Sequence, residues 1–221
     1  MINILCYSQD SRENSDGYRI VGQVLGLTDE SKIYLIHGGK RKRIDSAVVS
    51  NNRFFMTGKL DEPTHTYLYS GKTIKLADIL LDNRKIEVKG NAPIYDSIKI
   101  SGSDIDMQWK EWYQNDQRIG YQKYRIDKLY ESLMDKKDSD NAIVVKTLSQ
   151  ELMTDRITLL KTYVKRYNDS ASGAVLPTLC TIQASLTKLD YLEMYDSLTP
   201  RMRSTTFGNE ILKLAEKAKP N

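Results

Sequence analysis

The hydrophobic pattern of this chain changes its period once, beside Gly102 and Ser103, and that change limits the fold more than any other feature. Before it, short β-branched and aromatic runs are separated by turn residues at roughly 8–12-residue intervals, which is typical of an antiparallel β-sandwich or barrel. After it, apolar residues recur with a period of about 3.6, which indicates helices. The sequence therefore predicts an α+β protein with an antiparallel β domain of about eight strands over residues 17–103 and an α-helical domain over residues 104–221.

Turn residues divide the first half into short strands. Asn51 and Asn52 tolerate the positive φ angles of a tight two-residue turn, so we expect a hairpin there, and a second hairpin is expected around the turn at residues 28–31. Asp82 and Asn83 mark another tight turn. The expected strands cover residues 18–24, 32–36, 44–50, 53–58, 66–69, 77–81, 85–89 and 97–101.

The second half predicts two long antiparallel helices, over residues 104–136 and 145–167, joined by a polar break. Residues 168–170 supply capping side chains to a third, buried helix over residues 174–189. Pro177 must lie in the first turns of that helix or bend it. Two shorter helices are expected over residues 191–198 and 210–218.

Composition excludes several classes of protein. The chain has 221 residues, 40% of them apolar and 28% charged, which is enough for a folded protein with a buried core. The net charge of +4 is spread evenly, with 15 basic and 12 acidic residues before residue 104 and 18 and 17 from there on. No domain is basic enough to favour nucleic acid or an anionic membrane. The longest apolar runs fall far short of the roughly 20 residues that cross a bilayer, so we expect no membrane span.

Two interpretations of residues 1–16 remain open. In the first, these residues form a flexible terminus. In the second, they include the remnant of a signal sequence, with Cys6 as a lipid-attachment residue. Leu5 weakens the lipid interpretation because such sites prefer a small residue before the cysteine.

Two basic, glycine-containing segments could bind phosphates. Ser70-Gly71-Lys72-Thr73 resembles the end of a P-loop, but Thr66 stands where the loop needs its first glycine, so a turn between strands is favoured. Residues 38–43, Gly-Gly-Lys-Arg-Lys-Arg, could attract phosphates or an acidic partner, and a solvated hairpin turn is the alternative.

Residues suited to catalysis or metal binding are few and scattered. Asp104 and Asp106 fit the start of a helix better than a cation site, because no third ligand is near them in sequence. His37 and His65 lie far from any nucleophile motif. Cys180 is expected to be a small buried side chain, and no Cys-x-x-Cys pair occurs. We therefore assign no catalytic, cofactor-binding or metal-binding residue, and an active site assembled from distant residues is a minor alternative.

An aromatic row follows the start of the first long helix. Its members could stack bases or sugars, but their helical spacing favours the core or a contact with a second copy. A homodimer is therefore plausible. The row consists of Trp109, Trp112, Tyr113, Tyr121, Tyr124 and Tyr130.

The order of several weak motifs resembles a known arrangement. These are Tyr18-x-Ile20-x-Gly22-x-Val24, residues 44–49, Phe54-x-Met56-x-Gly58, residues 79–88, Ile100-Ser101-Gly102-Ser103, Asp169-Ser170, Leu189-Asp190-Tyr191 and Phe207-Gly208. This order is similar to that in the N-terminal domain of unknown function, with its helical segment, that precedes TlpA/ResA-like thioredoxin domains in Gram-negative envelope proteins. The resemblance covers roughly residues 18–218.

The resemblance implies a periplasmic or outer-envelope location, with a lipid anchor in the full protein as an option. It implies a non-catalytic accessory, scaffold or substrate-binding role for a thiol–disulfide oxidoreductase, with a thioredoxin-like domain as partner in cis or in trans. The Trp-Cys-x-x-Cys motif of that domain is absent from these 221 residues, so no catalytic residue can be transferred. The alternative is a stand-alone periplasmic protein that binds a peptide or a glycan.

Three Asp-Ser dipeptides followed by an apolar residue resemble sites of O-linked glycosylation in some Gram-negative envelope proteins. Each is equally a good turn or cap sequence. They lie at residues 45–47, 96–98 and 169–171.

Overall fold

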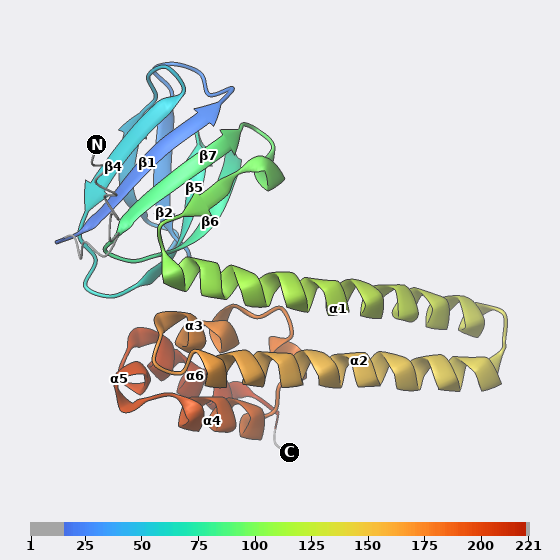
Figure 1. Ribbon diagram of the computed structural model, residues 1–221. Helices are drawn as coiled ribbons and strands as arrows, with labels where there is room; N and C mark the ends of the chain where they lie inside the picture. The colour runs from blue at the N-terminus through green and yellow to red at the C-terminus, as the bar shows by residue number, and fades with distance from the viewer. Residues whose placement is uncertain (1–15, 220–221) are drawn as a thin grey trace, which may run out of the picture. The chain divides into compact units, whose positions relative to one another are not determined.

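The computed structural model describes residues 16–219, in which the chain forms two compact units (Figure 1). The first unit extends to Ser103 and contains the strands, and the second begins at Asp104 and contains the long helices. The predicted α+β class, with an N-terminal sheet region followed by helices, is confirmed. The predictions for residues 1–15, including lipid attachment at Cys6, lie outside the described residues.

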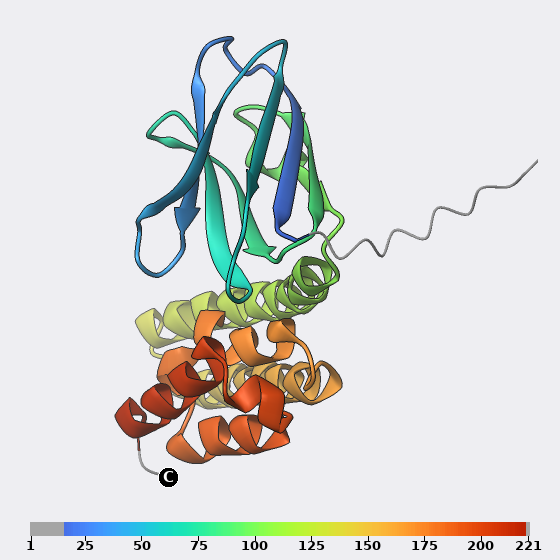
Figure 2. The same ribbon diagram turned by 90° about the vertical axis from the view of Figure 1, so that its left-hand side faces the viewer.

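The β unit is a sandwich of two four-stranded sheets, which Figure 2 shows as separate layers. Its strands are β1 (Tyr18–Leu25), β2 (Lys32–His37), β3 (Arg43–Val48), β4 (Arg53–Gly58), β5 (Thr64–Ser70), β6 (Ile74–Leu81), β7 (Lys85–Asn91) and β8 (Lys99–Ser101). One sheet has the order β4-β1-β7-β8 and the other β3-β2-β5-β6. The expected antiparallel pairing needs one correction, because β1 and β7 are parallel.

Alternating side chains build the core between the two sheets. On β1, Tyr18, Ile20, Gly22 and Val24 are buried and their neighbours are more exposed, as the two-residue period predicts. The same alternation on the other strands adds further fully buried apolar side chains, each of which contributes about 1.5–3 kcal/mol to folding. They include Ile33, Leu35, Leu68, Ile79, Ile86 and Val88.

Both expected hairpins between early strands are wrong. Asn51 and Asn52 do adopt positive φ angles of 52° and 59°, and the backbones of Ser50 and Arg53 exchange two hydrogen bonds. Outside the Ser50–Arg53 pair, however, the two strands separate: β3 pairs with β2 in one sheet, and β4 pairs with β1 in the other. The turn at residues 28–31 likewise connects β1 and β2, which lie in different sheets. A turn motif fixes the local backbone, but it does not decide which sheet each flanking strand joins.

The helical unit begins with the predicted antiparallel pair, α1 (Asp104–Asp135) and α2 (Ser139–Arg166). Smaller elements follow: α3 (Ala171–Leu179), the 3₁₀ helix η2 (Gln183–Ser185), α4 (Lys188–Ser197), α5 (Pro200–Arg203) and α6 (Thr206–Lys217). Another 3₁₀ helix, η1 (Tyr95–Ser97), belongs to the β unit. None of the helices in residues 16–219 has the length and apolar character needed to cross a membrane.

The single buried helix expected over residues 174–189 is wrong. α3 ends at Leu179, two residues after Pro177, which has no N–H to donate to the carbonyl one turn back. The backbone is extended at Cys180. α4 then starts separately, because Thr187 and Asp190 form a reciprocal capping box.

Candidate functional site

The outer face of the β3-β2-β5-β6 sheet carries a group of tyrosines. On β5, Thr66 and Leu68 are fully buried, so Tyr67 between them points to the opposite, partly exposed face together with Tyr69. On β2, Ile33 and Leu35 are buried in the same way, which leaves Tyr34 and Ile36 on the outer face.

Strand register places these side chains in two rows across the sheet. Tyr34 is paired with Tyr69, and Ile36 is paired with Tyr67. The rows continue onto β6, where Lys75 is opposite Tyr69 and Asp78 is opposite Tyr67. On β3, Ser46 and Arg43 extend them. We call this surface the tyrosine face and define it as Tyr34, Ile36, Arg41, Arg43, Tyr67, Tyr69, Lys75 and Asp78.

The basic turn between β2 and β3 folds onto this face. Arg41 has a positive φ of 53°, and its guanidinium carbon lies 4.5 Å from the centre of the Tyr67 ring. The ammonium group of Lys75 lies 4.7 Å from the same ring centre. Arg43 is 6.0 Å from the ring centre of Tyr34. The turn was predicted to be solvated. Two arginines of the turn are not only solvated, because they also pack over aromatic rings.

His37 fixes the start of the basic turn. Its Nδ1 accepts hydrogen bonds from the backbone N–H groups of Gly39, at 3.1 Å, and Lys40, at 3.2 Å. An acceptor at Nδ1 requires the neutral ring. Burial, together with the charges of Lys40 and His65, lowers the pKa of His37. The turn thus holds its shape at neutral pH.

Asp78 is the polar centre of the tyrosine face. Its Oδ2 lies 2.6 Å from Nζ of Lys75 and accepts a 2.5 Å hydrogen bond from the hydroxyl of Tyr95, while Nε2 of His65 lies 3.4 Å from Oδ1. Burial alone would raise the pKa of Asp78, but the hydrogen bonds from His65, Lys75 and Tyr95 and the charge of Lys75 lower it to about 2. The carboxylate is therefore ionised and already satisfied.

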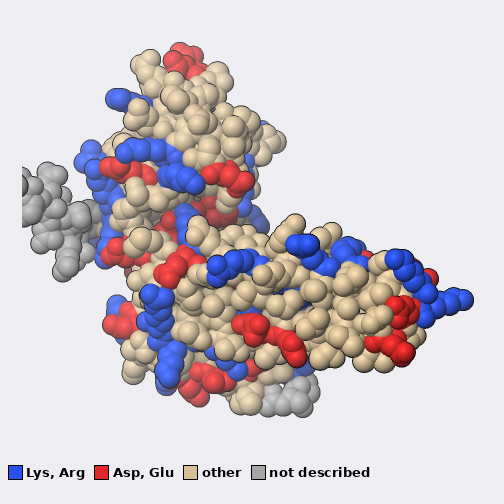
Figure 3. Space-filling model, turned by 45° about the vertical axis from the view of Figure 1, so that its right-hand side comes forward, with Lys and Arg blue, Asp and Glu red and all other residues tan. Residues whose placement is uncertain are grey.

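The cations of the turn differ from Lys75 in having no acidic partner. Among residues 16–219, Lys40, Arg41, Lys42 and Arg43 form no ion pair, whereas Lys75 is paired with Asp78. On the side of the molecule drawn in Figure 3, by contrast, acidic and basic side chains are interspersed. The tyrosine face can therefore offer guanidinium groups and phenol hydroxyls to an anionic ligand.

The other candidate phosphate-binding motif is not part of a phosphate site. Gly71, Lys72 and Thr73 form the turn between antiparallel strands β5 and β6, and Gly71 has a φ of 60°. A P-loop must lead into a helix, whose N-terminus faces the phosphates.

Cys180 is buried, as expected, with 5% of its surface exposed. Burial, reinforced by the charge of Asp116, raises the pKa of its thiol to about 12. The thiolate required for disulfide exchange is therefore almost unpopulated at neutral pH. Cys6, the other cysteine of the sequence, lies outside the described residues.

The predicted aromatic row on α1 is split between core and surface. Trp109 and Trp112 are buried, at 8% and 0% exposure. Tyr113, Tyr121 and Tyr124 are exposed at 43%, 65% and 55%, so of the two expected roles these three do not have a core position, and a contact with a second copy stays a prediction. Asp104 opens α1, and Asp106 is buried against Nζ of Lys110, 2.6 Å away, so neither belongs to a cation site.

A buried ion pair that the sequence reasoning missed joins α1 to α2. Arg156 donates two hydrogen bonds to Asp116 and one to Thr181. Both charged residues occupy positions of the apolar seam, at heptad-like distances from Trp112 and Leu152, and a polar residue at such a position was the available signal.

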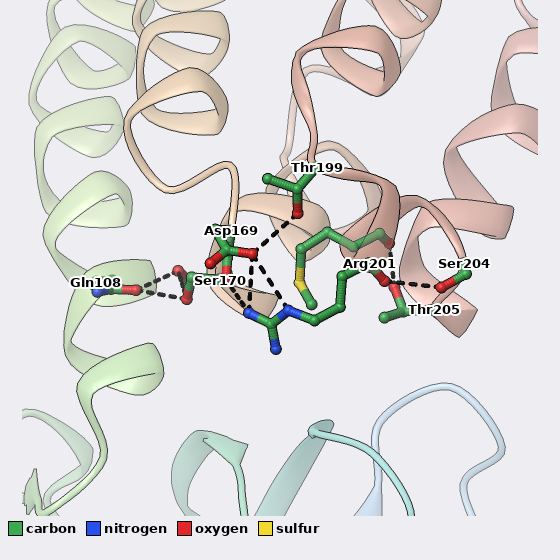
Figure 4. A network of polar contacts seen from close by, with 9 residues as sticks. Gln108, Asp169, Ser170, Thr199, Arg201, Ser204 and Thr205 are labelled. Atoms are coloured by element: carbon green, nitrogen blue, oxygen red, sulfur yellow. Dashed lines mark hydrogen bonds and ion pairs between the residues drawn. The ribbon is translucent and has the colours of Figure 1, made fainter.

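A second polar network surrounds the start of α3 (Figure 4). Oε1 of Gln108 on α1 accepts hydrogen bonds from the hydroxyls of Ser170 and Ser172, at 2.8 and 2.6 Å. Asp169 binds Arg201 and the hydroxyl of Thr199. Ser170 precedes α3 as predicted, but its side chain binds Gln108 instead of capping the helix. These contacts fasten the connections between helices.

The three Asp-Ser dipeptides lie in different environments. Ser46 is exposed on β3. The hydroxyl of Ser97 bonds to the backbone of Asn91 and Ile94, and Ser170 belongs to the network of Figure 4.

Within residues 16–219, no three His, Cys, Asp or Glu side chains lie close enough together to hold a metal ion.

Residues 18–109 match the family model "Domain of unknown function (DUF4369)", which spans the strands and the first turns of α1. No curated protein shows significant similarity to the chain.

Proposed function

We propose that this chain is a non-catalytic accessory region of a TlpA-like thiol–disulfide oxidoreductase of the cell envelope. In this role it binds substrate or holds a thioredoxin-like domain, in the same polypeptide or in another, close to its substrate. The order of motifs along the chain and the match of residues 18–109 to a domain of unknown function support the proposal.

The state of Cys180 is the observation that carries the non-catalytic part of this proposal. Thiol–disulfide exchange needs an accessible thiolate. Cys180 is buried and its thiol pKa is about 12. The redox cysteines must therefore come from outside the described residues, which is what an accessory role requires.

Sequencing the native gene beyond codon 221, together with its neighbours, tests the redox association. We expect a Trp-Cys-x-x-Cys motif in one of these places. If that motif is found in none of them, the redox association is overturned.

A stand-alone periplasmic binding protein for a peptide or a glycan is the second candidate. The tyrosine face favours it, because half-buried tyrosines beside exposed arginines on a sheet form a binding surface without a second domain. A native gene that ends near codon 221, with ligand binding by the purified protein, would support this candidate.

The envelope location belongs to the same proposal. Fractionation of the native host should place the protein in the periplasm or outer envelope, and metabolic labelling with a fatty acid would test lipid attachment at Cys6. Recovery in the cytoplasm contradicts the proposed role.

Light scattering at high concentration tests the proposed homodimer, for which the exposed Tyr113, Tyr121 and Tyr124 are the available surface.

A further inference from the structure

We propose that the tyrosine face is a docking surface for an acidic polypeptide segment. This inference rests on the proposed role of the chain as a binding region, but not on its association with a redox domain. It names the chemistry of the partner, which must supply several carboxylates close together in sequence.

The first support is the unpaired charge of the turn between β2 and β3. Arg41 and Arg43 are exposed and have no acidic partner among the described residues, and the same is true of Lys40 and Lys42. Elsewhere in the β unit, lysines such as Lys89 are paired with a neighbouring carboxylate. Four adjacent unpaired cations repel one another and gain most from an incoming anion.

The second support is that the charged groups are held in place. Arg41 packs over Tyr67 and Arg43 over Tyr34, while His37 fixes the backbone of the turn through two hydrogen bonds. Ordering a flexible arginine on binding costs side-chain entropy, and here part of that ordering precedes the ligand. A planar guanidinium held in this way can bind a carboxylate through two parallel hydrogen bonds.

The third support concerns the class of ligand. The Tyr67 ring already contacts two cations, Arg41 and Lys75, so it is not free to stack on a sugar. The rest of the face includes Ile36, Tyr34 and Tyr69. Ile36 can pack on apolar side chains of a peptide, and the tyrosine hydroxyls can form hydrogen bonds with its polar groups. Tyrosine, arginine and an aliphatic residue on one surface are the composition of a protein interface. These contacts favour a polypeptide over a glycan.

Asp78 does not oppose an acidic ligand. Its charge is balanced by Lys75, it accepts a hydrogen bond from Tyr95, and Nε2 of His65 lies 3.4 Å from its other carboxylate oxygen. Removing Asp78 would release Lys75 as an additional cation on the face.

The test measures binding of a fluorescent hexaglutamate peptide to the full chain by anisotropy at low salt, with a hexaglutamine peptide as the uncharged control. We expect the double variant R41Q/R43Q to weaken hexaglutamate binding at least about tenfold, since two charge-assisted contacts are lost. The matched control is R19Q/R53Q, which removes two exposed arginines from the other sheet, including one that packs on Phe55. This control should change the affinity less than about twofold. The circular dichroism spectra of both variants should match that of the wild type.

Several outcomes overturn the inference. It fails if hexaglutamate binds no better than hexaglutamine, or if both double variants weaken binding equally. Tighter, Arg41-dependent binding of dextran sulfate or of phosphatidylglycerol vesicles would reassign the face to a glycan or a membrane and also contradict the inference. None of these outcomes bears on whether a Trp-Cys-x-x-Cys motif accompanies the native gene, so the inference and the proposed redox association can fail separately.

Discussion

Arg156 holds both carboxylate oxygens of Asp116, with Nε 2.7 Å from Oδ1 and Nη2 2.6 Å from Oδ2. Asp116 is fully buried and Arg156 is 9% exposed, so each charge depends on the other for its stability. Gly120 makes room for the pair, because a Cβ at that position would lie 3.3 Å from Cζ of Arg156. Nη2 also donates to Thr181, which fastens the segment beside Cys180 to the helical pair.

Replacing Asp116 with Asn should destabilise the helical unit by about 3–5 kcal/mol, because Arg156 is left as a buried charge without a counter-ion. Both tryptophans of the chain lie on α1. Tryptophan fluorescence during urea unfolding therefore reports on this unit directly.

Asp127→Asn is the matched control for that change. Asp127 also lies on α1 and pairs with a cation, Lys123, but its side chain is 42% exposed. Its loss should cost less than about 1 kcal/mol, since exposed ion pairs contribute little. Equal effects of the two substitutions would refute the importance assigned to the buried pair.

Asp78 should make the β unit sensitive to acid. Its pKa is about 2 in the folded state and near 3.8 in an unfolded chain, so its contribution to stability is present above pH 4 and is lost as the pH falls toward 2. The difference is about 2 kcal/mol. In urea unfolding followed by circular dichroism, Asp78→Asn should therefore cost less at pH 2.5 than at pH 6.

Glu87→Gln provides the comparison for Asp78. Glu87 lies between Lys85 and Lys89 on β7 and is close to solvent. Solvent screens these pairs, so the effect of this substitution should change little between pH 6 and pH 2.5. A cost of Asp78→Asn that is equally independent of pH would contradict the hydrogen-bonded state of Asp78.

The strand and helix content could be predicted from the sequence because each depends on a local period. The two-residue alternation of β1 and the helical periods of α1 and α2 appear within single segments. Sheet membership could not be predicted, since β3 and β4 are adjacent in sequence and joined by a genuine tight turn but belong to different sheets.

The tyrosine face could not be predicted from the sequence either, because its residues come from separate strands. Tyr34 and Tyr69 lie 35 positions apart and become neighbours only through the register of β2 with β5. The basic residues 38–43 were noticed, but nothing in the sequence places Arg41 over Tyr67. Asp116 and Arg156 were missed because polar residues do not contribute to an apolar stripe, even where they occupy it.

Cys180 should resist modification while the protein is folded. Its burial and its thiol pKa of about 12 predict that a thiol reagent labels it only after unfolding. Mass spectrometry of peptides after labelling in buffer and in 6 M guanidinium chloride, roughly a fully denaturing concentration, separates Cys180 from Cys6. Rapid labelling of Cys180 in buffer would contradict its buried state.

The most direct test of the central claim, that this chain binds but does not catalyse disulfide exchange, is an insulin-reduction assay on the purified full chain with dithiothreitol as reductant. We expect a rate equal to the dithiothreitol background, unchanged in Cys6→Ser and Cys180→Ala variants. A rate clearly above background that either substitution abolishes would contradict it.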